Sequence, residues 1–350
     1  MQRGDFAKKT LIVLSFVTAS CSGPSGNGSL YLKKGLSAYE SADYREAIRL
    51  YGKAISLNKS YAEAYIARGN AKAELGDIDG AVRDYSDALS IDPVSPEAYF
   101  LRGFAKSNRG DGFGAIEDYT RAMEIAPSYI DAYLNRASEY LEMGKIAEAE
   151  ADYNRVIEIT PDRSAAFAGL GYVYKQKGEF TKAIDFFTKA IEINPSDGHA
   201  YGGRGLTKMQ QGEYRSAVSD FNRVLDIYPG NAWAYVNRGY ALAESGSLDK
   251  AIDDFTRAIS ENPNDFNAYN NRGFTFFEKG ELENAISDYN EAISINPDFA
   301  AAYENRSKAY KAQGDLRKAL NDAQKAVDLD PGNEEHVQLV EKLKNLINSN

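Results

Sequence analysis

The chain has 350 residues, of which 43% are hydrophobic, and it carries a formal net charge of −10. A chain of this length and composition can bury a sizeable core or form a long repeat array. Because no run of lysine or arginine offsets the negative charge, sequence-independent binding of nucleic acid is disfavoured. A single cysteine, Cys21, excludes an intrachain disulfide, and two histidines, His199 and His336, are too few for a zinc site of cysteine and histidine. We therefore expect neither a metal nor another cofactor.

The N-terminal residues differ from the rest of the chain. Three basic residues come first (Arg3, Lys8 and Lys9), and residues 11–19 form a short apolar run. A bilayer span needs about 20 residues, so this run suits the hydrophobic region of a signal peptide better than a transmembrane helix. Small residues then precede Cys21. This arrangement resembles the lipobox of bacterial lipoproteins, in which the cysteine becomes the lipidated first residue, although Thr18 stands where leucine or valine is usual.

The resemblance implies a lipoprotein-type signal peptide at residues 1–20, followed by the lipidated Cys21 and a flexible tether to residue 27. A membrane anchor of more than one acyl chain would then hold the protein in the bacterial cell envelope. Ser22 after the cysteine favours the outer membrane if the envelope is Gram-negative. Two alternatives stay open: an ordinary cleaved signal peptide, which would give a secreted or periplasmic protein, and an apolar N-terminus without a targeting role.

Prolines recur at a fixed spacing through the rest of the chain. Consecutive members of a set of eight are 34 residues apart: Pro93, Pro127, Pro161, Pro195, Pro229, Pro263, Pro297 and Pro331. One step earlier the same spacing falls on Lys59. A fixed period of this length is typical of repeat proteins. Residues 28–333 therefore divide into nine units of 34 residues, with the proline at unit position 32.

Other unit positions also keep one type of residue. Position 4 is aromatic and position 20 is alanine in every unit; position 24 is aromatic in eight units, position 8 is glycine in seven, and position 15 is glycine in all but the first, which has Ala42. Apolar residues at helical spacing flank position 15, which predicts two helices per unit with the glycine ending the first. The small residues let the two helices approach and the aromatic residues fill the space between them. The proline ends the second helix and can open the next one.

This period, together with the residues at positions 8, 20, 24 and 32, resembles the tetratricopeptide repeat (TPR) family. The resemblance covers residues 28–333 and implies an all-α, right-handed superhelical α-solenoid of nine helix-turn-helix units. One helical hairpin cannot bury its apolar face alone, so the units are expected to stack. Residues 334–350 have the pattern of one more amphipathic helix, similar to the solvating helix that covers the last repeat in this family. Its expected inner stripe is Val337, Val340, Leu343 and Ile347.

Unit positions 7 and 23 covary within the chain. Seven units have arginine at position 7 and aspartate at position 23, whereas the first unit has Lys34 with Leu50 and the fifth has Leu170 with Phe186. A buried ion pair can be exchanged for well-packed apolar residues, so both exceptions are physically consistent with pairing. We therefore predict structural ion pairs between the two helices of a unit: Arg68–Asp84, Arg102–Asp118, Arg136–Asp152, Arg204–Asp220, Arg238–Asp254, Arg272–Asp288 and Arg306–Asp322.

In TPR proteins the first helices line a concave face, mainly through unit positions 2, 5, 6, 9, 12 and 13. The resemblance therefore implies a peptide-binding groove made of the aromatic residues Phe100, Phe104, Tyr172, Trp233, Tyr240, Phe274 and Phe277 and the asparagines Asn135, Asn237, Asn270, Asn271 and Asn305. Exposed clusters of large apolar groups mark binding surfaces. Each asparagine amide can both donate to and accept from a peptide backbone. The alternative for each aromatic residue is packing against a neighbouring unit.

The expected groove lacks the cations of those TPR modules that clamp the C-terminal carboxylate of a chaperone. Such modules present lysine and arginine at positions 2, 5 and 6. Here position 2 holds Glu63, Glu97 and Asp131 in consecutive units, and position 6 is basic only at Lys33. We therefore expect a protein or extended-peptide ligand without a carboxylate clamp.

Together these patterns predict a membrane-anchored scaffold or adaptor for protein–protein interaction. An adaptor that binds peptidoglycan or another glycan in envelope biogenesis is the alternative, because aromatic and asparagine side chains also suit sugars. An enzyme is disfavoured. The glycines of "YGGRGLTK" (201–208) fall inside an expected first helix and not in a phosphate-binding loop, and His199 has no evident nucleophile partner.

Overall fold

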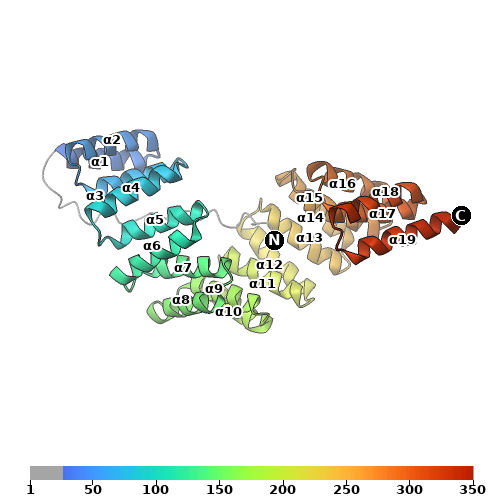
Figure 1. The fold of residues 1–350 in the computed structure, drawn as a ribbon. Helices are drawn as coiled ribbons and strands as arrows, with labels where there is room; N and C mark the ends of the chain where they lie inside the picture. Colours follow the sequence, from blue (N-terminus) through green and yellow to red (C-terminus); the bar gives the residue numbers. More distant parts are fainter. Residues whose placement is uncertain (1–26, 350) are drawn as a thin grey trace. The chain divides into compact units, whose positions relative to one another are not determined.

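The structure is a computed structural model that describes residues 27–349 (Figure 1). The expected signal peptide, Cys21 and most of the tether lie outside the described residues. Residues 27–349 contain helices and turns and no strand, which confirms the predicted all-α class. None of the helices in this range is long and apolar enough to cross a membrane. The chain divides after Glu179 into two compact parts.

The N-terminal part contains the helices α1 to α9. Their bounds are α1 Asn27–Glu40, α2 Tyr44–Leu57, α3 Ala62–Glu74, α4 Ile78–Ile91, α5 Pro96–Asn108, α6 Gly112–Ile125, α7 Ile130–Glu142, α8 Ile146–Ile159 and α9 Ser164–Gln176 (Figure 1). From α1 to α8 the helices form helical hairpins. In each hairpin the odd-numbered first helix packs on the even-numbered second helix that follows it.

The C-terminal part contains the helices α10 to α19. Their bounds are α10 Phe180–Ile193, α11 Gly198–Gln210, α12 Tyr214–Ile227, α13 Ala232–Glu244, α14 Leu248–Glu261, α15 Phe266–Glu278, α16 Leu282–Ile295, α17 Ala300–Gln313, α18 Leu316–Leu329 and α19 Glu334–Ser349. In this part the two helices of a unit pack on each other from α11 onward. Each second helix contacts in addition the first helix of the next unit, so the units stack in sequence order.

The turn inside each unit depends on a left-handed backbone residue at position 15. All eight glycines at this position have positive φ, between 72° and 86°. Glycine adopts this conformation without the steric penalty that a Cβ brings. Ala42 takes the same conformation in the first unit, with φ 58°. The predicted role of position 15 is therefore confirmed, and Ala42 carries backbone strain that the other units avoid.

In the units that lie wholly within one part, the core lies between the two helices. A Cβ on Gly69 would lie 2.6 Å from the ring of Tyr85, and one on Gly239 would lie 2.9 Å from the ring of Phe255. The alanine at position 20 is fully buried in every unit. Glycine at position 8 thus gives the aromatic ring at position 24 its space, as the sequence predicts.

Two details differ from the sequence-based expectation. The repeated proline lies in the turn after the second helix and does not open the next one: α14 ends at Glu261, Pro263 follows in the turn, and α15 begins at Phe266. In α19 the buried stripe includes Val340 and Leu343, which pack against alanines of α18. Val337 is 39% exposed, and His336 takes the inner position in its place.

Candidate functional site

The structure places each predicted arginine against its predicted aspartate. Between α13 and α14, Arg238 donates from Nε and from its second terminal nitrogen to the two carboxylate oxygens of Asp254, both at 2.7 Å. The other six pairs have a similar two-point geometry, and all seven aspartates are no more than 8% exposed. Two-point pairing of this kind is among the stronger charge-assisted interactions.

Each of six arginines makes a third hydrogen bond that the sequence analysis missed. The remaining terminal nitrogen of Arg238 donates to the Asn222 side chain of α12 at 2.6 Å. Its equivalents donate to Ser86, Thr120, Thr188, Thr256 and Asn290. These acceptors all occupy unit position 25 of the preceding unit. The recurrence of polar residues at that position is the sequence pattern from which the third hydrogen bond could have been predicted. The arginine therefore joins three helices, two of its own unit and one of the unit before.

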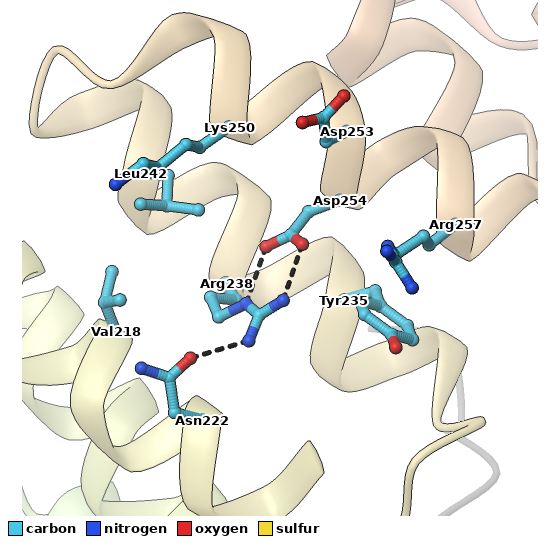
Figure 2. Close-up of a pocket in the computed structure, with 9 residues that line it drawn as sticks. All are labelled: Val218, Asn222, Tyr235, Arg238, Leu242, Lys250, Asp253, Asp254 and Arg257. Carbon is cyan, nitrogen blue, oxygen red and sulfur yellow. Dashed lines mark hydrogen bonds and ion pairs between the residues drawn. The ribbon is translucent and has the colours of Figure 1, made fainter.

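A pocket of about 420 Å³ lies around Arg238 (Figure 2). Helices α12 and α14 flank it, and α13 contributes Tyr235, Arg238 and Leu242. The full lining is Val218, Asn222, Tyr235, Arg238, Leu242, Lys250, Asp253, Asp254 and Arg257. The sequence predicts no binding site on this side of the units, since the covariation of Arg238 with Asp254 indicates a structural role alone.

The side chains of the pocket differ in their freedom to bind a ligand. Arg238 is fixed by Asp254 and Asn222, and its guanidinium also stacks over Tyr235 at 5.5 Å from the ring centroid. The hydrogen bonds that Arg238 donates to Asp254 raise the pKa of Arg238 above its usual value, so the guanidinium stays protonated. Lys250 and Arg257 are exposed at the edge.

The predicted groove residues lie on what we call the first-helix face, the surface formed by unit positions 2, 5, 6, 9, 12 and 13 of the odd-numbered helices. Tyr240 of α13 and Phe274 of α15 are both at position 9, and they are 40% and 41% exposed. These two helices contact each other directly. The C-terminal part therefore presents two partly exposed aromatic rings from consecutive first helices.

Other aromatic residues of the predicted groove pack inward. Phe104 is only 8% exposed and belongs to the core of the third unit, so its assignment to an open groove is wrong. Phe100 packs beside it and makes an edge-on contact with Tyr129 at 5.2 Å between centroids. Half-buried Phe277 packs on the core of the eighth unit, and Tyr172 is also half-buried.

Trp233 lies between these two outcomes. Its ring makes an edge-on contact with Phe221 of α12, with the centroids 5.8 Å apart. It also covers Gly202 of α11, where an added Cβ would lie 3.1 Å from the indole. The tryptophan is thus half-buried against the preceding unit, which is the packing alternative that the sequence left open.

The predicted asparagines use part of their hydrogen-bonding capacity within the protein. Asn135 and Asn237 each donate to the backbone carbonyl four residues earlier, at 2.8 and 2.7 Å. Asn305 donates to Asn270, which is 8% exposed and therefore not available as an open groove residue. Asn271 is half-buried on α15. The five residues do not form a continuous exposed series.

Within residues 27–349, no group of three or more histidine, cysteine, aspartate or glutamate side chains could hold a metal ion. The described residues offer two candidate sites: the first-helix face around Tyr240 and Phe274, and the pocket around Arg238.

Family models described as tetratricopeptide or TPR repeats match most of the chain. The matched residues are 28–61, 69–110, 130–163, 164–197, 203–266, 255–287, 273–314 and 300–333. No curated protein matches the chain in sequence.

Solved structures share the fold at low sequence identity. A tetratricopeptide repeat protein from Parabacteroides merdae is 23% identical over 71% of this chain and 98% of that chain, with a TM-score of 0.54. PilF of Pseudomonas aeruginosa is 19% identical over 61% of this chain and 97% of its own, also with a TM-score of 0.54. The Cut9–Hcn1 hetero-tetramer structure of the APC/C gives 16% identity over 90% of this chain and 77% of that chain, with a TM-score of 0.51. At these identities the similarity concerns the fold alone.

Proposed function

Because this chain belongs to the tetratricopeptide repeat family, we propose that it is a protein-interaction scaffold that binds an extended peptide segment on its first-helix face. The observation that carries the proposal is the exposure of Tyr240 and Phe274 at the same position of adjacent first helices. Tyrosine and other aromatic residues supply much of the energy of protein interfaces. A partner that covers both rings would remove apolar surface from water.

Neighbouring asparagines support a peptide ligand. Asn237 lies three residues before Tyr240, and Asn271 lies three residues before Phe274, so each is on the same side of its helix as the aromatic ring. The bond from Asn237 to the carbonyl of Trp233 uses one amide hydrogen and leaves the side-chain oxygen as an acceptor. An extended backbone offers N–H donors that match such acceptors, and hydrophobic side chains of the peptide would contact the rings.

Photo-crosslinking in cells tests this surface. A photoreactive amino acid at Tyr240 or Phe274, followed by mass spectrometry, should capture the same protein partner from both positions. Ser287, exposed on the second helix α16, is the matched control and should not capture it. Capture from Ser287 alone would refute the assignment to the first-helix face. Capture of cell-wall glycan at Tyr240 or Phe274 would favour the glycan-binding alternative.

We also propose that Cys21 is lipidated and anchors the scaffold in the bacterial cell envelope. The support is in the sequence: the basic residues, the short apolar run and the single cysteine stand in the order of a lipoprotein signal. Growth with a radioactive fatty acid should label the wild-type protein, and Cys21→Ser should lose both the label and the membrane fraction. Equal labelling of the two proteins would refute the proposal.

A further inference from the structure

We infer that the pocket between α12 and α14 is a second binding site, which takes an acidic peptide segment with one carboxylate beside Arg257 at one end and another beside Lys250 at the other end (Figure 2). This site lies on the side of the second helices, so it is separate from the first-helix face proposed above. Three features carry the inference: an unpaired arginine, a local positive charge and a pocket with apolar walls.

Arg257 differs from its counterparts in other units. Unit position 26 is also arginine in α6, α8 and α12, and there each guanidinium pairs with an acid three residues later: Arg121 with Glu124, Arg155 with Glu158 and Arg223 with Asp226, at 2.6 to 2.8 Å. In α14 the residue three later is Ser260, whose hydroxyl donates to the backbone carbonyl of Arg257. Arg257 consequently has no ion pair with any residue in the described part of the chain.

The charges of the pocket favour an anionic ligand. Lys250, like Arg257, makes no ion pair within residues 27–349, and both are exposed at the edge. The lining holds three cations (Arg238, Lys250 and Arg257) and two anions (Asp253 and Asp254), which leaves a net charge of +1. This contrasts with the formal charge of −10 for the whole chain. Asp254 is paired with Arg238, so Asp253 is the one unpaired anion of the lining.

The rest of the pocket suits a peptide better than a free ion. Val218 and Leu242 provide apolar walls that can contact the methylene groups of a glutamate side chain (Figure 2). The ring of Tyr235 lies against Arg257, with the guanidinium carbon 6.0 Å from the centroid, and this contact orients the cation. A volume of about 420 Å³ accommodates an acidic side chain with adjacent backbone.

The test uses the full-length chain in detergent and a fluorescein-labelled peptide of alternating glutamate and serine. Fluorescence anisotropy should show saturable binding, and the same peptide with glutamine for glutamate should bind roughly tenfold or more weakly, because it lacks the charge-assisted contacts. Ser260→Glu restores to α14 the acid that other units have. The new glutamate should form an ion pair with Arg257. It should therefore weaken binding of the glutamate peptide by a similar factor, although no cation is removed.

Three control variants separate this site from general electrostatics. Ser260→Gln should bind the glutamate peptide like the wild type, and Arg223→Gln, at the same position of α12 but outside the pocket lining, should also bind normally. The double variant Tyr240→Ala/Phe274→Ala should keep this binding even if it loses the partner of the first-helix face. Three results would overturn the inference. The first is an unchanged peptide affinity in Ser260→Glu, and the second is an equal loss of affinity in Arg223→Gln and in Arg257→Gln, the variant that removes the proposed cation. The third is displacement of the peptide by inorganic phosphate at equal concentration.

Discussion

Replacing Arg238 with leucine would leave the carboxylate of Asp254 without its main partner. Asp254 is 4% exposed and accepts two hydrogen bonds of 2.7 Å from Arg238. Removing one member of a buried ion pair costs roughly 3–5 kcal/mol, because the remaining charge stays desolvated and unpaired. The loss of the bond to Asn222 adds to this cost. We therefore expect Arg238→Leu to lower the urea midpoint strongly, as followed by circular dichroism.

The double variant Arg238→Leu/Asp254→Phe provides the decisive comparison, since it installs the apolar pair that the fifth unit has at the same positions. It should recover most of the lost stability, because no charge remains buried. Arg257→Leu is the matched control for the removal of one arginine. Arg257 is exposed and unpaired in the described chain, so its loss should change stability by less than about 0.5 kcal/mol. A urea midpoint of Arg238→Leu equal to that of the wild type would refute the reasoning.

Three further changes have outcomes that follow from the structure. Ala42→Gly should stabilise the protein by about 0.5–1 kcal/mol in chemical denaturation, because relief of the positive φ exceeds the added entropy of the unfolded chain; a lower midpoint would contradict this. Gly69→Ala should destabilise it by about 1–3 kcal/mol, since the new Cβ would meet the ring of Tyr85 at 2.6 Å; an unchanged midpoint would show that the ring moves freely. Burial raises the pKa of Glu97, so the ionised carboxylate opposes folding above that pKa. Glu97→Gln should therefore raise the melting temperature near pH 7. It should not do so at a pH well below about 4, where Glu97 is protonated in both the folded and the unfolded protein. An equal gain in melting temperature at both pH values would exclude the buried charge as its cause.

Much of the fold could be predicted because each repeated residue has a local physical role. The 34-residue period, the glycine at position 15 and the small residue at position 8 determine where helices end and where they approach, and Gly76 and Gly69 illustrate both roles. The ion pairs could also be inferred, since nine units in one chain allow covariation to be seen without related sequences.

The candidate sites were less predictable because exposure depends on the neighbouring unit as well as on helical register. Phe104 and Phe274 share unit position 9, yet Phe104 is 8% exposed and Phe274 is 41% exposed. Trp233 packs inward because Gly202 leaves room for the indole. The pocket at Arg257 was missed for another reason: its distinguishing feature is the serine at position 260, which becomes informative only when the ion pairs of the other units are known.

The three-helix contacts of the arginines have a consequence for how the solenoid unfolds. Each one makes the stability of a unit depend on the unit before it, which is the nearest-neighbour coupling that gives repeat arrays their cooperativity. The fifth unit has Leu170 at this position, and leucine cannot donate such a bond to α8. The series of arginines is thus interrupted once, so the coupling of α9 to α8 should be weaker, and local opening there should expose their amide hydrogens to exchange. Whether this repeated position holds leucine or arginine would then decide how many consecutive units unfold together.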